Sequence, residues 1–508
     1  MTGRLSLRTD SSEPPFKRIL IANRGEIAVR VIRACREMGI SPITVHSDVD
    51  ADALHVRLAD RSEPIGPGPA RESYLSIPAV IDAARRSGAE AIHPGYGFLS
   101  ENAEFARATE EAGIVFIGPP PSVLEGLGNK VAARRSAAAA GVPIVPGTTV
   151  ALDTDTTAVE EIGFPVMLKA AAGGGGRGMR RVDSPAELAE AMAAARREAE
   201  AAFGDGTIYV ERLVAPARHI EVQLLGDRHG GLAVLGERDC SVQRRHQKLV
   251  EESPSPAVDE TTRAALFDSA RRVAGTVDFH NAATVEFLLD VHGDHFFLEM
   301  NTRLQVEHGV TELVTGLDLV AWQIRVAAGE ALPPGVLEPL LHGHAIEVRL
   351  YAEDPYDGFS PTSGRIGAWR MAAGPGIRVD AGMEADTDLR PEYDPLLAKL
   401  MVHAVDRPAA VDRLRRALDE TLIGGLQTDA GFLRWLVEDP AFASGSYDTS
   451  LIPERWMKGP SVAPDDRALT ALAALEARRG LPVAAAGAFI PQPGSAWGDQ
   501  ARRDALRR

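Results

Sequence analysis

Cysteine is almost absent from this 508-residue chain, which has only Cys35 and Cys240. The two residues lie far apart in the sequence, and neither belongs to a C-x-x-C pair. A disulfide framework and a cysteine-rich zinc site are therefore excluded, because both need several cysteines at short spacings. Such low cysteine usage fits a reducing compartment, so the sequence predicts a cytoplasmic protein.

Long apolar runs are also lacking. Glycine, proline or a charged residue interrupts every stretch of about 18 apolar residues, so no membrane-spanning helix is expected. The leader, residues 1–16, is polar and lacks the apolar core of a signal peptide. We predict that it is a disordered tail.

Positive charge is in deficit. Lysine and arginine number 55 against 71 aspartate and glutamate residues, which gives a formal net charge of −16. An acidic surface of this kind repels phosphate backbones. Nucleic acid is therefore not expected as a partner.

Glycine is scarce at the first strand–helix turn. An apolar strand over residues 17–22 precedes a helix whose apolar stripe includes Ile27 and Val31. Continued alternation of strands and helices predicts a parallel sheet with covering helices, a Rossmann-like α/β domain over residues 17–130. The turn contains Gly25 but no G-x-G-x-x-G pattern, which argues against NAD or FAD.

The rest of the chain divides into three segments. Residues 131–213 are predicted to form a small mobile lid with a glycine-rich turn. Residues 214–458 combine alternating strands with helices such as Ala409–Glu420, which indicates a larger α+β unit. Residues 459–508 are predicted to be a variable tail with one helix around Asp466–Arg478.

Four consecutive glycines lie inside the predicted lid. Lys169 closes an apolar strand, and the loop Ala171–Gly178 follows, with Gly174, Gly175 and Gly176 near its centre. Backbone N–H groups of glycine approach an anion closely because no Cβ blocks them. No Gly-Lys-Ser/Thr follows, so the loop is not a Walker A loop. We interpret it as a cover over a triphosphate, with a flexible hairpin loop as the alternative.

Two acidic residues face each other across a predicted hairpin. The strands Thr284–Asp290 and His295–Asn301 would place Glu286 opposite Glu299, with Asn301 on the same face. Two carboxylates and an amide oxygen are hard ligands of the kind that magnesium prefers. The pattern predicts a magnesium site, and ordinary polar alternation on a solvent face is the alternative.

Polar residues continue at alternate positions beyond this hairpin as Arg303, Gln305 and Glu307. Fully extended, the chain from Glu299 to Glu307 would span about 26 Å, at roughly 3.3 Å per residue, which is too long for one site. If the chain bends after Asn301, a guanidinium and an amide can hold a small planar anion while Glu307 acts as its base. The spacing alone leaves both arrangements open.

A dense cationic run, Arg244-Arg245-His246-Gln247-Lys248, stands out in this acidic chain. Charge runs are usually solvated faces, and that interpretation stays open. The run follows an apolar strand, however, and loops at strand ends often carry function. Phosphate or carboxylate groups would be attracted to it.

Five segments together resemble the biotin carboxylase family, in order over about residues 17–458. They are Ile21–Ala28, His93–Ser100, the glycine loop, the cationic run and Glu299–His308. The resemblance implies an ATP-grasp fold of mixed α/β and α+β class. Its N-terminal domain would be Rossmann-like (preATP-grasp), followed by a mobile glycine-rich lid and a C-terminal α+β domain.

The resemblance also implies a role for each matching residue. Around ATP it implies Lys130, Lys169, Gly174, Gly175, Gly176, Glu211, His219, Gln243 and His246. On magnesium or manganese it implies Glu286, Glu299 and Asn301. Around bicarbonate and biotin it implies Lys248, Arg303, Gln305, the backbone of Val306, Arg349 and Asp394.

The implied reaction carboxylates biotin at the expense of ATP and bicarbonate, as the first half-reaction of an acyl-CoA carboxylase of fatty acid biosynthesis. Glu307 would deprotonate bicarbonate, which attacks the γ-phosphate of ATP to give carboxyphosphate. Lys248 and Arg303 would hold the anion, and Arg349 would steady the biotin enolate. The stretch Glu347–Pro355 favours acyl-CoA carboxylases over pyruvate carboxylase.

The family's partners are a biotin carboxyl carrier protein and a carboxyltransferase, both expected as separate chains. Trp456-Met457-Lys458-Gly459 matches the family's biotin-accepting motif poorly, so no biotin is expected on this chain. A homodimer is also expected. Arg30, Arg33 and Glu37 are predicted on the exposed side of the first helix, and Arg378 matches a family dimer residue.

Three positions depart from the family pattern. Asn129 stands where Asp is common, Arg212 where Lys is common, and Gly309 where Pro usually follows Glu307-His308. We expect Gly309 to give the backbone more freedom beside the base. Two other classes stay open: a different ATP-grasp ligase, such as a carbamoyl-phosphate synthetase half, and a regulator that keeps the fold without turnover.

Overall fold

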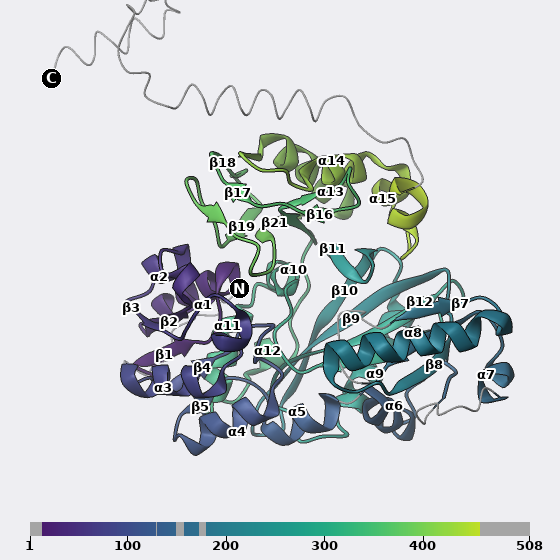
Figure 1. Ribbon diagram of the computed structural model, residues 1–508, viewed down its shortest axis with the longest axis horizontal. Helices are drawn as coiled ribbons and strands as arrows, with labels where there is room; N and C mark the ends of the chain where they lie inside the picture. Colours follow the sequence, from purple (N-terminus) through teal and green to yellow (C-terminus); the bar gives the residue numbers. More distant parts are fainter. Residues whose placement is uncertain (1–12, 129, 149–156, 172–178, 458–508) are drawn as a thin grey trace, which may run out of the picture. The chain divides into compact units, whose positions relative to one another are not determined.

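The computed structural model describes residues 13–128, 130–148, 157–171 and 179–457 (Figure 1). Several predicted features lie outside these residues, namely Asn129, Gly174, Gly175, Gly176 and the helix around residues 466–478. Phe16, which we assigned to a disordered tail, is buried against the N-terminal core because its ring packs with apolar neighbours there. No helix among the described residues is long and apolar enough to cross a bilayer.

The N-terminal region is built on a five-stranded sheet with the order β3-β2-β1-β4-β5, and its pairings are all parallel. The sequence predicted this sheet and its helices. The elements are β1 Arg18–Ile21, α1 Gly25–Glu37, β2 Ser41–His46, η1 Asp48–Asp50, α2 Leu54–Leu58, β3 Arg61–Pro64, η2 Ala70–Glu72, α3 Ile77–Ser87, β4 Ala91–His93, α4 Ala103–Glu111, β5 Val115–Phe116 and α5 Pro121–Gly128.

A small antiparallel sheet, β7-β6-β8, follows, with α8 packed on its strands. Its apolar core includes Val166, Leu168 and Val210. The elements are α6 Lys130–Ala139, α7 Thr157–Ile162, β6 Val166–Ala170, β7 Arg180–Val182, α8 Pro185–Phe203 and β8 Ile208–Arg212. Helix α6, which we placed at the start of the lid, packs on β13 and α9 of the next region.

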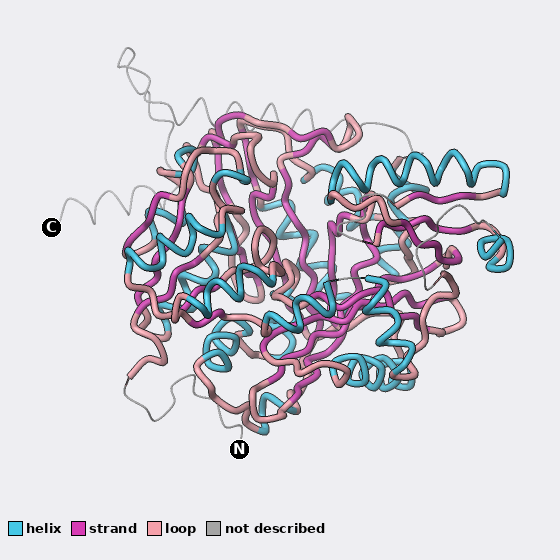
Figure 2. The backbone as a smooth tube through the Cα atoms, turned by 60° about the horizontal axis from the view of Figure 1, so that its bottom comes forward, coloured by secondary structure: helices cyan, strands magenta, loops and turns pink. Residues whose placement is uncertain are grey.

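The largest sheet has eight antiparallel strands in the order β13-β12-β9-β10-β11-β14-β21-β19. In Figure 2 its long strands cross the interior, and helices lie mostly around the outside. Strand β9 shows why the sequence folds this way, since Ile220, Val222 and Leu224 alternate with polar residues and enter an apolar core.

The elements of this region up to β14 are β9 Ala217–Gly226, β10 Leu232–Arg244, β11 Gln247–Ser253, α9 Glu260–Ala274, β12 Asn281–Asp290, β13 His295–Asn301, α10 His308–Thr315, α11 Leu319–Ala327, α12 Pro334–Leu337 and β14 His344–Tyr351. Those beyond it are β15 Glu353–Asp354, β16 Ser360–Pro361, β17 Gly364–Arg365, β18 Ala368–Arg370, β19 Ile377–Ala381, β20 Asp388–Leu389, β21 Leu396–Ala404, α13 Arg407–Glu420, β22 Leu422–Gly424, α14 Ala430–Glu438, α15 Pro440–Ser444 and η3 Ile452–Trp456.

One residue on the first helix was placed on the wrong side. Arg30, predicted to be exposed on α1, is buried, and its Nη2 donates to Glu312 Oε1 at 2.8 Å and Asp318 Oδ1 at 2.7 Å. Helix α1 packs on α11, so the charged side chain finds carboxylate partners inside the fold. Arg33 and Glu37 are exposed, as predicted.

Gly309 also differs from our expectation. It lies inside α10 with no left-handed backbone, so conformational freedom is not its role. A Cβ at this position would come within 2.3 Å of Met401 Sδ and 3.2 Å of Glu347 Oε2. The missing side chain therefore allows α10 to pack closely on β14 and β21.

We predict that Gly309→Ala lowers the free energy of unfolding by about 1–3 kcal/mol, because an added methyl overpacks the contact with Met401. Denaturant midpoints measure the change. Gly126→Ala is the matched control, since Gly126 is also helical and has open space around its Cβ position. Equal midpoints for Gly309→Ala and the wild type would contradict the packing argument.

Candidate active site

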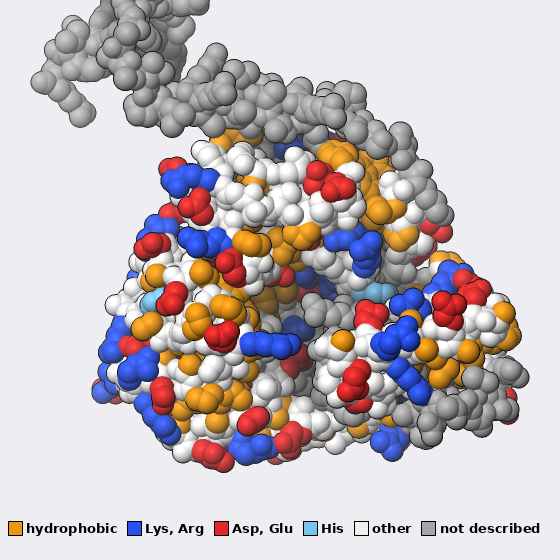
Figure 3. Space-filling model, in the orientation of Figure 1, with side chains coloured by type: hydrophobic (Ala, Val, Ile, Leu, Met, Phe, Trp, Pro, Cys, Tyr) orange, Lys and Arg blue, Asp and Glu red, His pale blue; other side chains and the backbone are white. Residues whose placement is uncertain are grey.

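The site centres on the ammonium of Lys248, in strand β11. Its Nζ lies 2.7 Å from Glu221 Oε2, 3.0 Å from Glu286 Oε1 and 2.6 Å from Glu307 Oε1. Burial opposes the charge, but these three carboxylates raise the pKa of Lys248 well above its ordinary value. Figure 3 shows a hollow in the middle of this face of the molecule, with acidic and basic side chains visible in it.

Glu307 is held between two cations. Its Oε1 accepts from Lys248, and its Oε2 accepts from Arg349 Nη2 at 2.9 Å. Burial favours the neutral acid, yet Lys248, Arg349 and Arg238 together hold the pKa of Glu307 well below its ordinary value. Glu307 is also the N-cap of α10, where the helix dipole favours negative charge. The carboxylate is therefore ionised at neutral pH and available to accept a proton.

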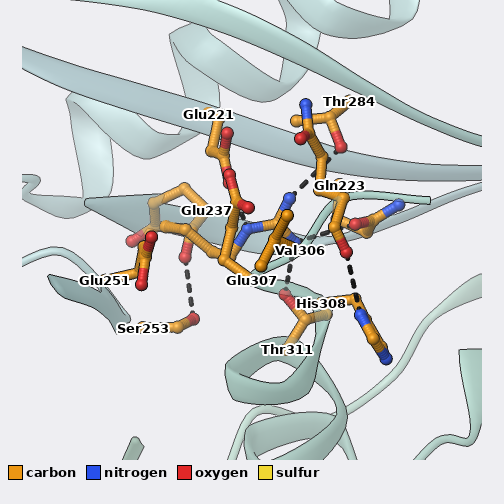
Figure 4. A network of polar contacts seen from close by, with 12 residues as sticks. Glu221, Gln223, Glu237, Glu251, Ser253, Thr284, Val306, Glu307, His308 and Thr311 are labelled. Atoms are coloured by element: carbon orange, nitrogen blue, oxygen red, sulfur yellow. Dashed lines mark hydrogen bonds and ion pairs between the residues drawn. The ribbon is translucent and has the colours of Figure 1, made fainter. Parts of the chain in front are cut away.

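A fully buried guanidinium supports this arrangement. Arg238 donates to Glu221, to Gln223 Oε1 and Thr311 Oγ1 at 2.8 Å, and to Thr284 Oγ1 at 3.2 Å. Figure 4 shows these partners converging from the strands of the sheet and from helix α10. The network fixes Glu221 beside Lys248, because the hydrogen bonds of Arg238 link neighbouring strands and limit their movement relative to one another.

The hairpin that we predicted for magnesium places its two carboxylates opposite each other. Glu286 on β12 pairs directly with Glu299 on β13, and Asn301 Nδ2 donates to Glu286 Oε1 at 2.8 Å. Burial opposes ionisation of both acids, but Lys248 and His219 lower the pKa of Glu286, and Lys130 lowers that of Glu299. Each carboxylate is thus charged and lies next to the ammonium of a lysine. The hairpin therefore already binds positively charged groups.

The structure adds a neighbour that we did not predict. Among the described acidic, histidine and cysteine side chains, donor atoms of His219, Glu221 and Glu286 lie within 4.8 Å of one another. His219 Nε2 is 2.7 Å from Glu286 Oε2. His219, which the resemblance assigned to the nucleotide, therefore also borders the candidate magnesium ligands.

The chain does bend after Asn301, which is the bend that the second of our two arrangements requires. Strand β13 ends there, and α10 begins at His308. Arg303 Nη1 donates to Gln305 Oε1 at 2.9 Å, and Gln305 Nε2 donates to Glu286 Oε1 at 3.2 Å. The bend brings the polar run back against the metal hairpin.

The cationic run is a tight turn rather than one solvated face. Arg245 and His246 have positive φ angles of 47° and 69° and link β10 to β11. Arg244 stacks over Phe359 and lies 3.4 Å from Glu353, whereas Lys248 points inward. Gln243 pairs with Lys248 across the two strands.

The residues predicted around the nucleotide lie on the lid side of this centre. Lys130 Nζ is 2.5 Å from Glu299 Oε2, and Lys169 donates to the buried Glu211, which also accepts from Arg134. Desolvation, and then the charges of Lys169, His219 and Lys130, lower the pKa of His246. Lys130, Lys169 and His219 therefore lie close enough to His246 to act on it electrostatically.

Val306 and Asp394 are the two remaining predicted site residues. The carbonyl oxygen of Val306 accepts from Lys399 Nζ at 2.7 Å. Asp394 follows Tyr393, whose ring stacks against Arg24 and whose hydroxyl lies 2.7 Å from Ser47 Oγ. Desolvation outweighs the nearby charges of Arg349 and Arg24, so the pKa of Asp394 is raised.

Sequence reasoning missed four residues of the site: Glu101, Glu221, Arg238 and Glu251. Glu101 Oε2 is 3.0 Å from Arg303 Nε, and Glu251 Oε1 is 2.5 Å from Arg349 Nη2. One signal was available, since Glu221 alternates with the apolar residues of β9 on the same face as His219. The others meet their partners only through tertiary contacts.

Three family models match the chain in order. They are "Biotin carboxylase, N-terminal domain" over residues 15–124, "Carbamoyl-phosphate synthase L chain, ATP binding domain" over residues 129–334 and "Biotin carboxylase C-terminal domain" over residues 347–454. The outer two models distinguish this chain from a carbamoyl-phosphate synthetase half, an alternative that the sequence motifs alone left open.

Relatives and solved structures agree with these matches. Biotin carboxylase of Nostoc sp. is 50% identical over 442 residues, which is 86% of this chain and 99% of the relative. Methylcrotonoyl-CoA carboxylase subunit alpha of Glycine max is 48% identical, and the match covers 87% of this chain and 61% of that one.

Two solved structures are also similar. The Campylobacter jejuni biotin carboxylase complex with β,γ-ATP has a TM-score of 0.84 and 46% identity, covering 87% of this chain and 99% of that one. The Hydrogenobacter thermophilus 2-oxoglutarate carboxylase biotin carboxylase domain, a dimer with MgADP and bicarbonate, has a TM-score of 0.84 and 44% identity, covering 86% and 97%.

Proposed function

The chain belongs to the biotin carboxylase family, and we propose that the residues around Lys248 perform the family's reaction. The protein is an ATP-grasp ligase that uses ATP and bicarbonate to carboxylate biotin on a carrier protein. One observation carries the assignment of residues: the ionised Glu307 lies between Lys248 and Arg349, next to the Glu286–Glu299 hairpin.

Glu307 is the base for bicarbonate. Its carboxylate is ionised at neutral pH, but the same cations that keep it ionised also weaken it as a base. Bicarbonate bound by Lys248, Arg303 and Gln305 would draw Lys248 toward its own negative charge. Glu307 then becomes a stronger base once bicarbonate is bound, and it takes the proton of bicarbonate. The deprotonated anion attacks the γ-phosphorus of ATP, the bond from that phosphorus to the bridging oxygen of ADP breaks, and carboxyphosphate forms as ADP leaves.

The acidic hairpin suits magnesium. Glu286 and Glu299 are ionised oxygen donors on adjacent strands, and the side-chain amide oxygen of Asn301 is a third donor. A magnesium or manganese ion held there would neutralise charge on the phosphates. Lys130 lies beside Glu299, and both Lys130 and Lys169 act on His246, so these three side chains would hold the phosphates and orient the terminal one.

We expect Glu307→Gln to keep ATP binding but to lose about 10²- to 10⁴-fold in bicarbonate-dependent ATP cleavage, because an amide cannot accept the proton. ADP release with and without bicarbonate measures the effect. Glu384→Gln is the control, since Glu384 pairs with Arg57 on the surface and should change nothing. Turnover of Glu307→Gln within about threefold of the wild type would remove Glu307 from the base role.

Arg349 serves the acceptor. We expect Arg349→Ala to reduce carboxylation of free biotin about tenfold more than bicarbonate-dependent ATP cleavage, because its guanidinium stabilises charge on the biotin ureido oxygen. Arg365→Ala, which removes a surface arginine paired with Asp386, should leave both rates unchanged. Equal losses in the two assays would contradict this role.

We propose a homodimer that uses the exposed face of α1. Arg33 and Glu37 are exposed on that helix, and Arg378, on β19, pairs with Glu312 and Asp380 within the chain. The exposed Pro375 stands where the family often has an aromatic residue, so this interface would bury less apolar surface. Further support is that the Hydrogenobacter thermophilus domain is a dimer.

Light scattering at micromolar concentration should show a dimer that Arg33→Glu dissociates at least in part. Arg36→Glu is the matched control, because Arg36 lies on the same helix and is equally exposed. Both arginines contact groups within the chain, but Arg33 lies near Asp380 beside Arg378, whereas Arg36 contacts Asp60 and Leu58. A monomer in the wild type, or equal behaviour of the two variants, would reject this interface.

The acceptor and its location are also proposals. We propose a biotin carboxyl carrier protein on a separate chain and a carboxyltransferase that passes the carboxyl group to an acyl-CoA. The Nostoc relative, matched over 99% of its own length, supports a separate carrier, and the methylcrotonoyl-CoA carboxylase subunit supports an acyl-CoA. A cytoplasmic location is supported by Cys35 and Cys240, which are buried and free.

A further inference from the structure

Two adjacent glutamates on β11, Glu251 and Glu252, are both buried but lie on opposite faces of the strand, and their carboxylates differ in hydrogen bonding. Glu252 is well paired: its carboxylate accepts from His344, from Arg407 and from the hydroxyl of Tyr447. These partners outweigh burial and lower the pKa of Glu252 to about 2. Glu251 faces the other side of the strand, toward Glu307, and is equally buried. Neither of its oxygens has a hydrogen-bond partner among the described residues.

The contact of Glu251 with Arg349 is close but is not aligned as a hydrogen bond. Arg349 Nη2 is 2.5 Å from Glu251 Oε1 and donates its hydrogen bond to Glu307 instead. Directly across the sheet from Glu251 stands Glu347 on β14. Glu347 is also fully buried, and within the described residues no hydrogen bond reaches its carboxyl group.

The cations nearby are already engaged. Lys248 contacts Glu221, Glu286 and Glu307, and Lys399 on β21 contacts Val306 O and Glu26 Oε1, at 2.7 and 3.2 Å. The groups that face the pair are Lys248 on β11, Arg349 and Tyr351 on β14, Lys399 on β21, Glu307 at the start of α10 and the thiol of Cys240 on β10. Gly309 of α10 closes the space over Glu347.

Two buried carboxylates on directly paired positions, with one misaligned arginine between them and the base, cannot both remain charged at low cost. We propose that Glu251 and Glu347 hold one proton between them at neutral pH and act as positioning residues that set how firmly Arg349 is held. This inference rests on the function proposed above, because it concerns the residue that serves the biotin acceptor.

The direction of the effect follows from the charge on the pair. Burial is the main cause that raises the pKa of Glu251, to about 7, and burial and Glu251 raise that of Glu347 well above its ordinary value. With one proton the pair carries one negative charge, and Arg349 can turn toward biotin. As pH rises and that proton leaves, the second charge holds Arg349 more firmly. The biotin-dependent rate should therefore fall before ATP cleavage does.

The experiment compares kcat/KM for free biotin in the wild type and in Glu347→Gln from about pH 6 to about pH 9. The amide is neutral like the protonated acid, and it removes the like charge beside Glu251. We expect kcat/KM of the wild type to fall about tenfold toward the alkaline end, and that of Glu347→Gln to fall much less. A tenfold fall corresponds to a free-energy difference of about one pKa unit. The biotin-independent ATPase activity should show the same profile in both proteins.

Glu252→Gln is the matched control, since the residue lies on the same strand with equal burial and faces away from Arg349. It should keep the alkaline fall of the wild type. Infrared spectroscopy of the wild type near neutral pH should also show the carbonyl band of a buried protonated carboxylic acid. The pair's share of that band should be lost in the difference spectrum of Glu347→Gln against the wild type and kept in that of Glu252→Gln, since other buried acids such as Asp429 absorb in all three proteins. The difference spectrum tests the shared proton even where a variant is inactive.

Superimposable pH profiles for the wild type and Glu347→Gln, or a difference spectrum in which Glu347→Gln loses no carboxylic acid band, would overturn the inference. Failure of the proposed function looks different. In that case the wild type would show no bicarbonate-dependent ATP cleavage, and the infrared band would still report whether the two carboxyl groups hold a proton.

Discussion

The burial of the Lys248 ammonium among Glu221, Glu286 and Glu307 is the constraint on which the rest of the site depends. Removing one partner from a buried ion cluster costs about 3–5 kcal/mol, because the remaining charges stay buried without compensation. Each carboxylate in turn belongs to another function. Glu221 joins the Arg238 network, Glu286 joins the hairpin with Glu299, and Glu307 is the base that we propose.

This arrangement explains how the buried carboxylate of Glu307 can stay ionised. Burial raises the pKa of a carboxyl group that cations do not compensate well, and it raises the pKa of Glu251 and of Glu347 on the same sheet. Glu307 avoids this rise because Lys248, Arg349 and Arg238 approach it from three different strands. Neighbouring glutamates of one sheet thus differ in pKa according to the cations that reach them.

The eight-stranded sheet provides the rigidity that this contrast needs. Strands β9, β10, β11, β12 and β14 each contribute charged side chains on the face that α10 covers, and their register fixes which of these groups meet. Arg238 ties three strands to α10 through its hydrogen bonds, so a small shift of one strand would disturb several partners at once. Close packing at Gly309 holds the helix that begins at Glu307 against the same strands.

Much of the fold followed from local patterns in the sequence. The parallel N-terminal sheet, the hairpin that pairs Glu286 with Glu299 and the strand end at the cationic run were all predicted, because strand periodicity and turn residues act over a few residues. The same reasoning failed for Arg30. A charged residue on an amphipathic helix is expected to face solvent, and nothing nearby in the sequence shows that Glu312 and Asp318 will cover it.

The sequence by itself therefore determined the chemical groups of the site and the family, since motif residues and their order do not depend on coordinates. It left open whether the chain bends after Asn301. The tertiary structure decided that bend, the position of Lys248 between three carboxylates, the tight fit at Gly309 and the meeting of Glu251 with Glu347. These are contacts between residues from different strands and helices. Periodicity fixes the face on which a side chain lies, but only sheet register and helix packing fix its partner.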